Sequence, residues 1–181
     1  MTGSLQAAAL ATALTAASCA LPAHHARVSV SLNIAADANV RRPIPVDLVF
    51  VWDDALVAQL EAMTAGDWFG KKAALLQGDP TGKVLTVCGW EWVPGQDVSP
   101  VDLMVPASAR RWVRAVYVFA NYRSAGAHRA RLEPGRAASL DLGRDDMNLR
   151  LADRATAPEY KELGQVDACR QTPAASPRSP L

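Results

Sequence analysis

The sequence predicts an all-β protein, a two-sheet β-sandwich with a short helical insertion at about residues 54–77. Seven or eight short segments alternate apolar and polar residues with the period of two that a half-buried strand shows. Pro and Gly turns separate these segments at short intervals, as in sandwiches. Between residues 53 and 77 the period changes, and apolar residues recur at helical spacing.

The first predicted strand, residues 28–34, alternates without interruption, so one of its faces should be buried. The second, residues 46–52, is apolar on both faces, which predicts a central strand covered on both sides. The remaining predicted strands are residues 84–92, 101–105, 112–122, 138–142 and 147–151. We expect the segment at 112–122 to be the longest apolar strand.

Inside the helical insertion, Asp53 and Asp54 are expected to cap a first helix that ends at Gly66. Asp67 is expected to cap a second helix. The Gly- and Pro-containing stretch at residues 78–82 predicts a turn back into strand structure.

The chain of 181 residues has room for one domain with a leader and a tail. We expect a signal peptide at residues 1–19 and a tether at 20–27. The β-sandwich domain should span residues 28–152. A Pro/Ser-rich tail at 153–181 is expected to be largely disordered, because it cannot bury enough apolar surface.

The leader is uncharged from residue 5 to residue 21 and ends in small residues before Cys19. This stretch is similar to a bacterial lipobox, in which the cysteine is lipidated and becomes the first mature residue. Ala16 stands where such boxes usually carry Leu, and no Lys or Arg occurs in residues 1–6. An Ala-rich helix holding a buried cysteine is the alternative. Ala20 is not the Asp of inner-membrane retention, so the similarity implies the outer membrane.

Charge excludes several classes of partner. Lys and Arg total 19 and Asp and Glu 18, a net charge of +1, with no basic stripe for nucleic acid.

No apolar run after residue 22 approaches the roughly 18 residues of a spanning helix. The mature chain should therefore meet a membrane only through its lipid anchor.

The cysteines suit an exported protein. With Cys19 lipidated, Cys88 and Cys169 remain as a pair that an oxidising periplasm could join. The alternative is a buried Cys88 and a free Cys169. No Cys/His spacing of a metal site occurs, so we expect no metal and no cofactor.

No catalytic constellation is present in the sequence, which predicts that the protein is not an enzyme. His24 and His25 lie in the expected tether. His128 lies in a turn among arginines, without a carboxylate to orient it. Asp145 and its neighbour Asp146 are expected to be turn residues.

Trp90 and Trp92 share one face of a predicted strand. Such a pair can form a stacking platform for carbohydrate or peptidoglycan, which is the alternative function for this chain. Because Val84 and Cys88 lie on the same face, we expect the tryptophans to belong to the core.

The loop between the first two strands carries the candidate partner-binding site. Two adjacent arginines offer forked donors for carboxylates, and flanking prolines lower the ordering cost of binding. The site residues are Asp37, Ala38, Asn39, Val40, Arg41 and Arg42. An ordinary solvated connector is the alternative.

Taken together, several motifs resemble TssJ, the outer-membrane lipoprotein family of the type VI secretion system. They are the lipobox-like leader, Arg42-Pro43-Ile44-Pro45-Val46 before the second strand, Asp67-Trp68-Phe69 in the insertion and Phe119-Ala120-Asn121-Tyr122-Arg123 after the long strand. The resemblance covers roughly residues 10–152. It implies a transthyretin-like sandwich anchored in the outer membrane and facing the periplasm. It also implies that residues 37–42 bind the periplasmic region of a TssM-like inner-membrane protein, and through it a TssL-like protein.

Overall fold

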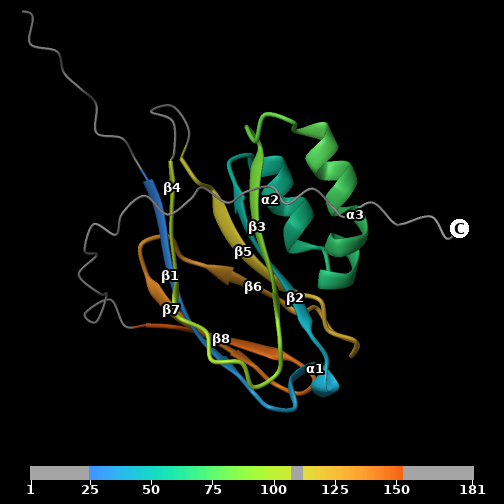
Figure 1. Cartoon of the computed structure of the whole chain (residues 1–181). Helices are drawn as coiled ribbons and strands as arrows, with labels where there is room; N and C mark the ends of the chain where they lie inside the picture. Colours follow the sequence, from blue (N-terminus) through green and yellow to red (C-terminus); the bar gives the residue numbers. More distant parts are fainter. Residues whose placement is uncertain (1–24, 107–111, 153–181) are drawn as a thin grey trace, which may run out of the picture.

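The computed structural model describes residues 25–106 and 112–152, whose strands form two sheets packed face to face (Figure 1). The strands are β1 (His25–Ile34), β2 (Ile44–Val51), β3 (Leu85–Trp92), β4 (Val101–Pro106), β5 (Ala115–Ala120), β6 (Arg129–Leu132), β7 (Ala137–Leu142) and β8 (Met147–Leu151). The helices are α1 (Ala38–Arg41), α2 (Asp54–Glu61) and α3 (Ala65–Gly78). The predicted all-β sandwich with a helical insertion is confirmed.

One sheet has the strand order β4-β1-β7-β8, and the other has the order β3-β2-β5-β6. Every hydrogen-bonded pair is antiparallel except β1 and β7, which run parallel from Ser29 opposite Ala137 to Ile34 opposite Leu142. In β1 the alternation works as predicted, because Val28 and Val30 are buried between the sheets.

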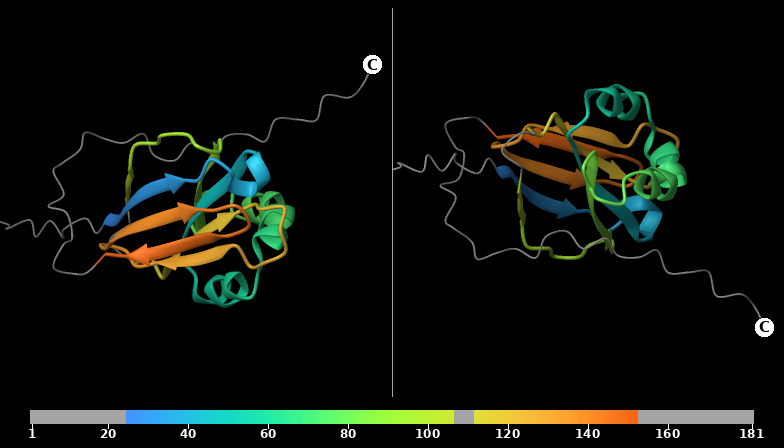
Figure 2. Two further views of the ribbon diagram at one scale, coloured as in Figure 1. Left: turned by 90° about the horizontal axis from the view of Figure 1, so that it is seen from below. Right: turned by 90° about the horizontal axis from the view of Figure 1, so that it is seen from above.

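The second predicted strand is central, as expected. β2 lies between β3 and β5. Leu48 and Phe50 pack between the sheets, whereas Val49 and Val51 pack under the helices. Both faces of this strand are therefore covered, which explains its unbroken apolar character. Figure 2 shows the helices α2 and α3 on the outer side of this sheet.

The helix starts differ in part from the prediction. Asp53 caps α2 as expected, since its Oδ1 accepts a hydrogen bond from the Leu56 N–H at 2.9 Å. The expectation that Gly66 ends the first helix and Asp67 caps the second is wrong. Thr64 caps α3, accepting from the Asp67 N–H at 3.1 Å, while the Asp67 carboxylate accepts from the Thr64 N–H at 3.2 Å. This reciprocal capping box places Gly66 and Asp67 inside the first turn of α3.

The strands around β5 and β6 correct two further expectations. β5 has 6 residues, all of them apolar and buried, so the strand occupies only part of the predicted segment at 112–122. β6 was not predicted, because its arginines break the apolar alternation. Arg129 donates to the carbonyls of Leu60 and Met63 at the end of α2, at 3.3 and 2.7 Å. The Arg129 guanidinium therefore joins the sheet to the end of the helix, although an arginine in the sequence suggested a solvent-exposed loop.

A buried carboxylate fixes α3 on the sheet. Asp47 in β2 is 2% exposed and accepts from Trp68 Nε1 at 2.8 Å and from Lys72 Nζ at 2.8 Å. Its neighbour across the ladder is Gly89, where an added Cβ would lie 2.7 Å from Asp47 Oδ1. The close approach of the carboxylate thus requires glycine in β3.

The two ends of β1 lie at opposite ends of the sandwich. The strand begins at His25, so residues 25–27 of the expected tether are strand. It ends at the connection to β2, where α1 lies at the bottom of Figure 1. At about 3.3 Å per residue, its 10 residues separate these ends by about 30 Å.

Candidate functional site

The connection between β1 and β2 contains a strained, left-handed turn. Asn39, Val40 and Arg41 have φ angles of 45°, 53° and 60°, so α1 is not a right-handed helix. The left-handed region costs a non-glycine residue roughly 1–2 kcal/mol, and Val is poorly suited to it because its Cβ is branched. Three such residues in succession persist only where surrounding contacts hold them.

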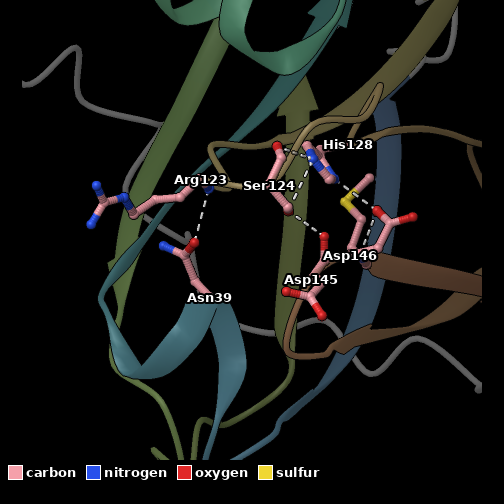
Figure 3. A network of polar contacts seen from close by, with 7 residues as sticks. Asn39, Arg123, Ser124, His128, Asp145 and Asp146 are labelled. Carbon is pink, nitrogen blue, oxygen red and sulfur yellow. Dashed lines mark hydrogen bonds and ion pairs between the residues drawn. The ribbon is translucent and has the colours of Figure 1, made fainter.

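Those contacts come from Asn39, which is 3% exposed. Its Oδ1 accepts from the Arg123 N–H at 3.0 Å, and its Nδ2 donates to the Pro43 carbonyl at 3.0 Å. The backbone N–H groups of Asn39 and Val40 donate to the carbonyls of Gly143 and Arg144 at 3.2 and 3.3 Å. The β5–β6 and β7–β8 connections therefore both support the turn (Figure 3).

Some of the six predicted site residues are buried and hold the turn in place, whereas others are exposed and available to a partner. Ala38 and Asn39 are buried, so they hold the turn and do not offer a surface. Val40 is 49% exposed, and Arg41 and Arg42 are exposed beside it. Neither arginine has an ion-pair partner among the described residues. The Asp37 carboxylate lies 4.0 Å from Arg144.

Two functional candidates at this end escaped the sequence-based prediction. Arg123 is exposed, and its side chain turns away from the polar network in Figure 3. Arg144 lies between Asp37 and Asp145, at 4.0 and 3.8 Å. Arg123 follows Tyr122 in one of the motifs of the TssJ resemblance. This motif was the only feature of the sequence that pointed to Arg123. No local pattern predicts that Arg123 lies beside Asn39, because the two residues are 84 positions apart.

His128 corrects a further expectation, because the structure does supply a carboxylate to orient it. Its Nδ1 lies 2.8 Å from Asp146 Oδ1, and its Nε2 lies 3.4 Å from Ser124 Oγ. These are the residue types of a hydrolytic triad, but their hydrogen bonds are not those of one. Nε2 is only 2.9 Å from the Ser124 carbonyl oxygen, and the Ser124 hydroxyl donates to the Asp145 carbonyl. The imidazole therefore does not activate the hydroxyl, and the cluster is a structural contact between two connections.

The predicted tryptophan pair belongs to the core, as expected. Trp92 is 5% exposed, and Trp90 is partly buried. Their rings stack on each other with centroids 5.7 Å apart, inside the cluster between the sheets. Each ring uses one face to stack on the other, and the Trp92 ring is almost fully covered.

The cysteines are only partly within the described residues. Cys88 is buried on β3 and is disulfide-bonded. Cys19 and Cys169, its two candidate partners, lie outside the described residues. Within residues 25–106 and 112–152, no three His, Cys, Asp or Glu side chains gather as a metal site. In the same part of the chain, no helix has the length and apolar character to span a membrane.

Comparisons with known proteins identify similar structures. No protein-family model matches the sequence. A comparison with curated proteins also gives no match. The chain is similar to Serratia marcescens Lip, a membrane-bound component of the type VI secretion system, at 15% identity and a TM-score of 0.51, covering 72% of this chain and 99% of that one.

Two further solved structures are similar to the chain. The type VI lipoprotein TssJ1 from Pseudomonas aeruginosa has 16% identity, a TM-score of 0.49, and coverage of 72% of this chain and 98% of that one. The C-terminal domain of the type VI protein TssM from EAEC has 13% identity, a TM-score of 0.43, and coverage of 70% and 97%. At such identities a likeness concerns the fold alone. The chain has the fold of Lip, the membrane-bound type VI secretion component, and this is the fold that its resemblance to TssJ implied.

Proposed function

We propose that this protein is a periplasm-facing outer-membrane lipoprotein of a type VI secretion membrane complex. It docks the periplasmic domain of a TssM-like inner-membrane protein, and through it meets a TssL-like protein. The Lip-like fold supports this role. The observation that carries the docking site is the left-handed turn at residues 39–41, which costs free energy to hold and presents Val40 and two unpaired arginines to solvent.

The position of the turn favours a partner across the periplasm. In this proposal Cys19 carries the lipid, six residues before the start of β1 at His25. The turn lies at the other end of β1, about 30 Å from His25. Several acyl chains hold such a protein durably, since each buried CH₂ contributes about 0.8 kcal/mol. In this proposal the anchor precedes one end of β1, and the docking surface follows its other end.

The role is a binding one and not a catalytic one. The one Ser–His–Asp cluster of the described residues has Nε2 of His128 against a carbonyl oxygen. The pair Trp90 and Trp92 is packed into the core, so no observation favours the alternative role in binding carbohydrate or peptidoglycan. Exposed, unpaired arginines instead suit carboxylates on a protein partner, which they can bind with two parallel hydrogen bonds.

The docking site is tested with the full-length lipoprotein in detergent, titrated with the periplasmic domain of the TssM-like protein of the same genome. Arg41→Glu and Arg42→Glu should each weaken binding at least about tenfold, because each reverses a charge at the interface. Lys71→Glu is the matched control. Lys71 is exposed on α3, away from the turn, so its reversal should leave affinity unchanged. Wild-type affinity in both arginine variants would remove the turn from the interface.

The anchor is tested separately by metabolic labelling with palmitate. Wild-type protein should incorporate label and fractionate with the outer membrane. Cys19→Ser should lose the label and appear in the soluble periplasmic fraction. Label retained by Cys19→Ser would exclude Cys19 as the lipidation site.

A further inference from the structure

The His128 ring lies between two acceptor oxygens from different connections. The side chain is 4% exposed. Its Nδ1 is 2.8 Å from Asp146 Oδ1 in the β7–β8 connection, and its Nε2 is 2.9 Å from the Ser124 carbonyl in the β5–β6 connection (Figure 3). The ring packs on Tyr122, with ring centroids 4.9 Å apart. It is therefore held from both sides and from one face.

The number of protons on the ring follows from its partners. A carbonyl oxygen only accepts, and an ionised carboxylate only accepts. The Ser124 hydroxyl, the remaining donor nearby, already donates to the Asp145 carbonyl. A neutral imidazole has one N–H, so either tautomer leaves a nitrogen lone pair against an oxygen. Only the doubly protonated ring satisfies both contacts.

We propose that doubly protonated His128 is a proton-dependent latch that joins the β5–β6 and β7–β8 connections and so sets the conformation of the turn at residues 39–41. Loss of one ring proton breaks one of the two contacts. The effect on conformation is independent of any partner, whereas the effect on docking rests on the proposed function.

The charged groups around the ring are few. Asp146 is the carboxylate in direct contact, and its Oδ1 also accepts from the Met147 N–H at 2.7 Å. In the β5–β6 connection, burial raises the pKa of Tyr122, so the phenol facing the ring is neutral. Arg123 turns away in Figure 3. Arg129 reaches the carbonyls at the end of α2, and the Asp145 carboxylate lies beside Arg144.

The latch reaches the turn through backbone hydrogen bonds. Gly143 and Arg144, just before Asp146, supply the carbonyls that the N–H groups of Asn39 and Val40 contact. On the other side of the ring, the Arg123 N–H holds the Asn39 side chain. Both connections that His128 joins therefore end on the strained turn.

Close packing of the latch also depends on Gly126. Its φ is 159°, and an added Cβ would lie 2.6 Å from His128 Cε1. Only glycine lets the connection close over the ring at this distance. The β5–β6 connection is therefore shaped to enclose the imidazole.

The test is an NMR titration of the full-length, isotope-labelled lipoprotein in detergent between pH 5 and 8. We expect both ring nitrogens of His128 to carry protons at the acidic end. The backbone amides of Asn39 and Val40 should shift at the same pH at which the ring loses its second proton. A ring with a single proton throughout, or amides that do not follow the ring, would overturn the proposal.

Two variants isolate the latch. His128→Gln should abolish the pH response of the two amides. Replacing both other histidines, His24→Gln with His25→Gln, should leave it unchanged. Affinity of the wild type for the TssM-like domain should fall about tenfold as the ring deprotonates, and the pH dependence should vanish in His128→Gln. A wild type that binds no such domain at any pH would contradict the proposed function, while the amide shifts would still decide the latch.

Discussion

At the scale of single residues, Asp47 has a large expected effect on stability. It is a buried carboxylate on a central strand, and both of its partners come from α3. Removing one member of a buried ion pair leaves the other charge without compensation. Lys72 is 31% exposed, so part of its charge can turn to water.

Asp47→Ala is therefore expected to lower the free energy of unfolding by about 3 kcal/mol, at the lower end for buried pairs. Urea unfolding followed by tryptophan fluorescence measures this, because unfolding exposes the buried Trp68 and Trp92 to water. Asp54→Ala serves as the control, since Asp54 is 77% exposed and lies 3.6 Å from Arg114. It should cost no more than about 1 kcal/mol. Equal losses in the two variants would contradict the role of Asp47.

A second residue-scale prediction concerns pH. Burial alone would raise the pKa of Asp79, but hydrogen bonds from the N–H groups of Leu85, Val84 and Lys83 outweigh it and lower the pKa. The folded pKa is therefore below the unfolded value of 3.8. The carboxylate stabilises the fold above the unfolded value, and this contribution is lost as pH falls below it.

We expect the free energy of unfolding to fall as pH decreases below 3.8. In Asp79→Asn this fall should be shallower, because the titrating group is gone. Thermal melts from pH 5 to pH 2 measure both slopes. Identical slopes would mean that Asp79 does not titrate differently on folding.

Some residue-scale features could be predicted from local sequence and others could not. The Asp53 cap follows from an acidic residue before an amphipathic run, and the inward Trp90 and Trp92 follow from their spacing of two. The contact of His128 with Asp146 joins residues 18 apart, and that of Asn39 with Arg123 joins residues 84 apart. Such contacts depend on which loops the two sheets bring together, which no local period encodes.

At the scale of elements, the left-handed turn stores strain that can be relieved. Asn tolerates the left-handed region better than the β-branched Val does. Val40→Asn should therefore raise the free energy of unfolding by about 1 kcal/mol. Val93→Asn is a matched control, because Val93 is 53% exposed without a positive φ. Val93→Asn should not raise the free energy of unfolding. If both variants raise it, the cause is the added polarity and not the relief of strain.

Element by element, the strands with clear alternation were predictable and β6 was not. In β1 and β2 the apolar residues of the sequence are the ones that are buried, so their pattern was enough to predict these strands. In β6, Arg131 lies 2.5 Å from Glu61 and Arg129 contacts the end of α2. These arginines face the helices that cover the sheet. In the sequence alone, these two arginines look like residues of a solvent-exposed loop. Only the position of the helices shows that they belong to a strand.

At the scale of the whole molecule, the disulfide of Cys88 raises the question of its partner, since both candidates lie outside the described residues. Cys88 is disulfide-bonded, and a lipidated Cys19 has no free thiol to pair with it. We therefore predict a disulfide between Cys88 and Cys169. Such a long closed loop could stabilise the fold by roughly 4 kcal/mol.

Peptide mapping by mass spectrometry under non-reducing conditions tests the pairing. Cys88 and Cys169 should appear in one linked peptide that reduction separates. Cys169→Ser should leave Cys88 reactive toward maleimide after unfolding and should unfold at lower urea concentration. A peptide linking Cys88 to Cys19 would contradict both the pairing and the lipid anchor.

The placement of β1 between the expected anchor and the turn has a mechanical consequence. In the proposed role, a pull arrives at β1 from the anchor at its first residue and from the partner at the turn after its last residue. β1 is flanked by β4 and β7, with six register pairs to each. Because β1 is already extended, tension applied at its two ends passes along its covalent backbone, and the hydrogen bonds to β4 and β7 carry little of the load. The strand that carries the tether is thus also the one best placed to transmit force without unfolding.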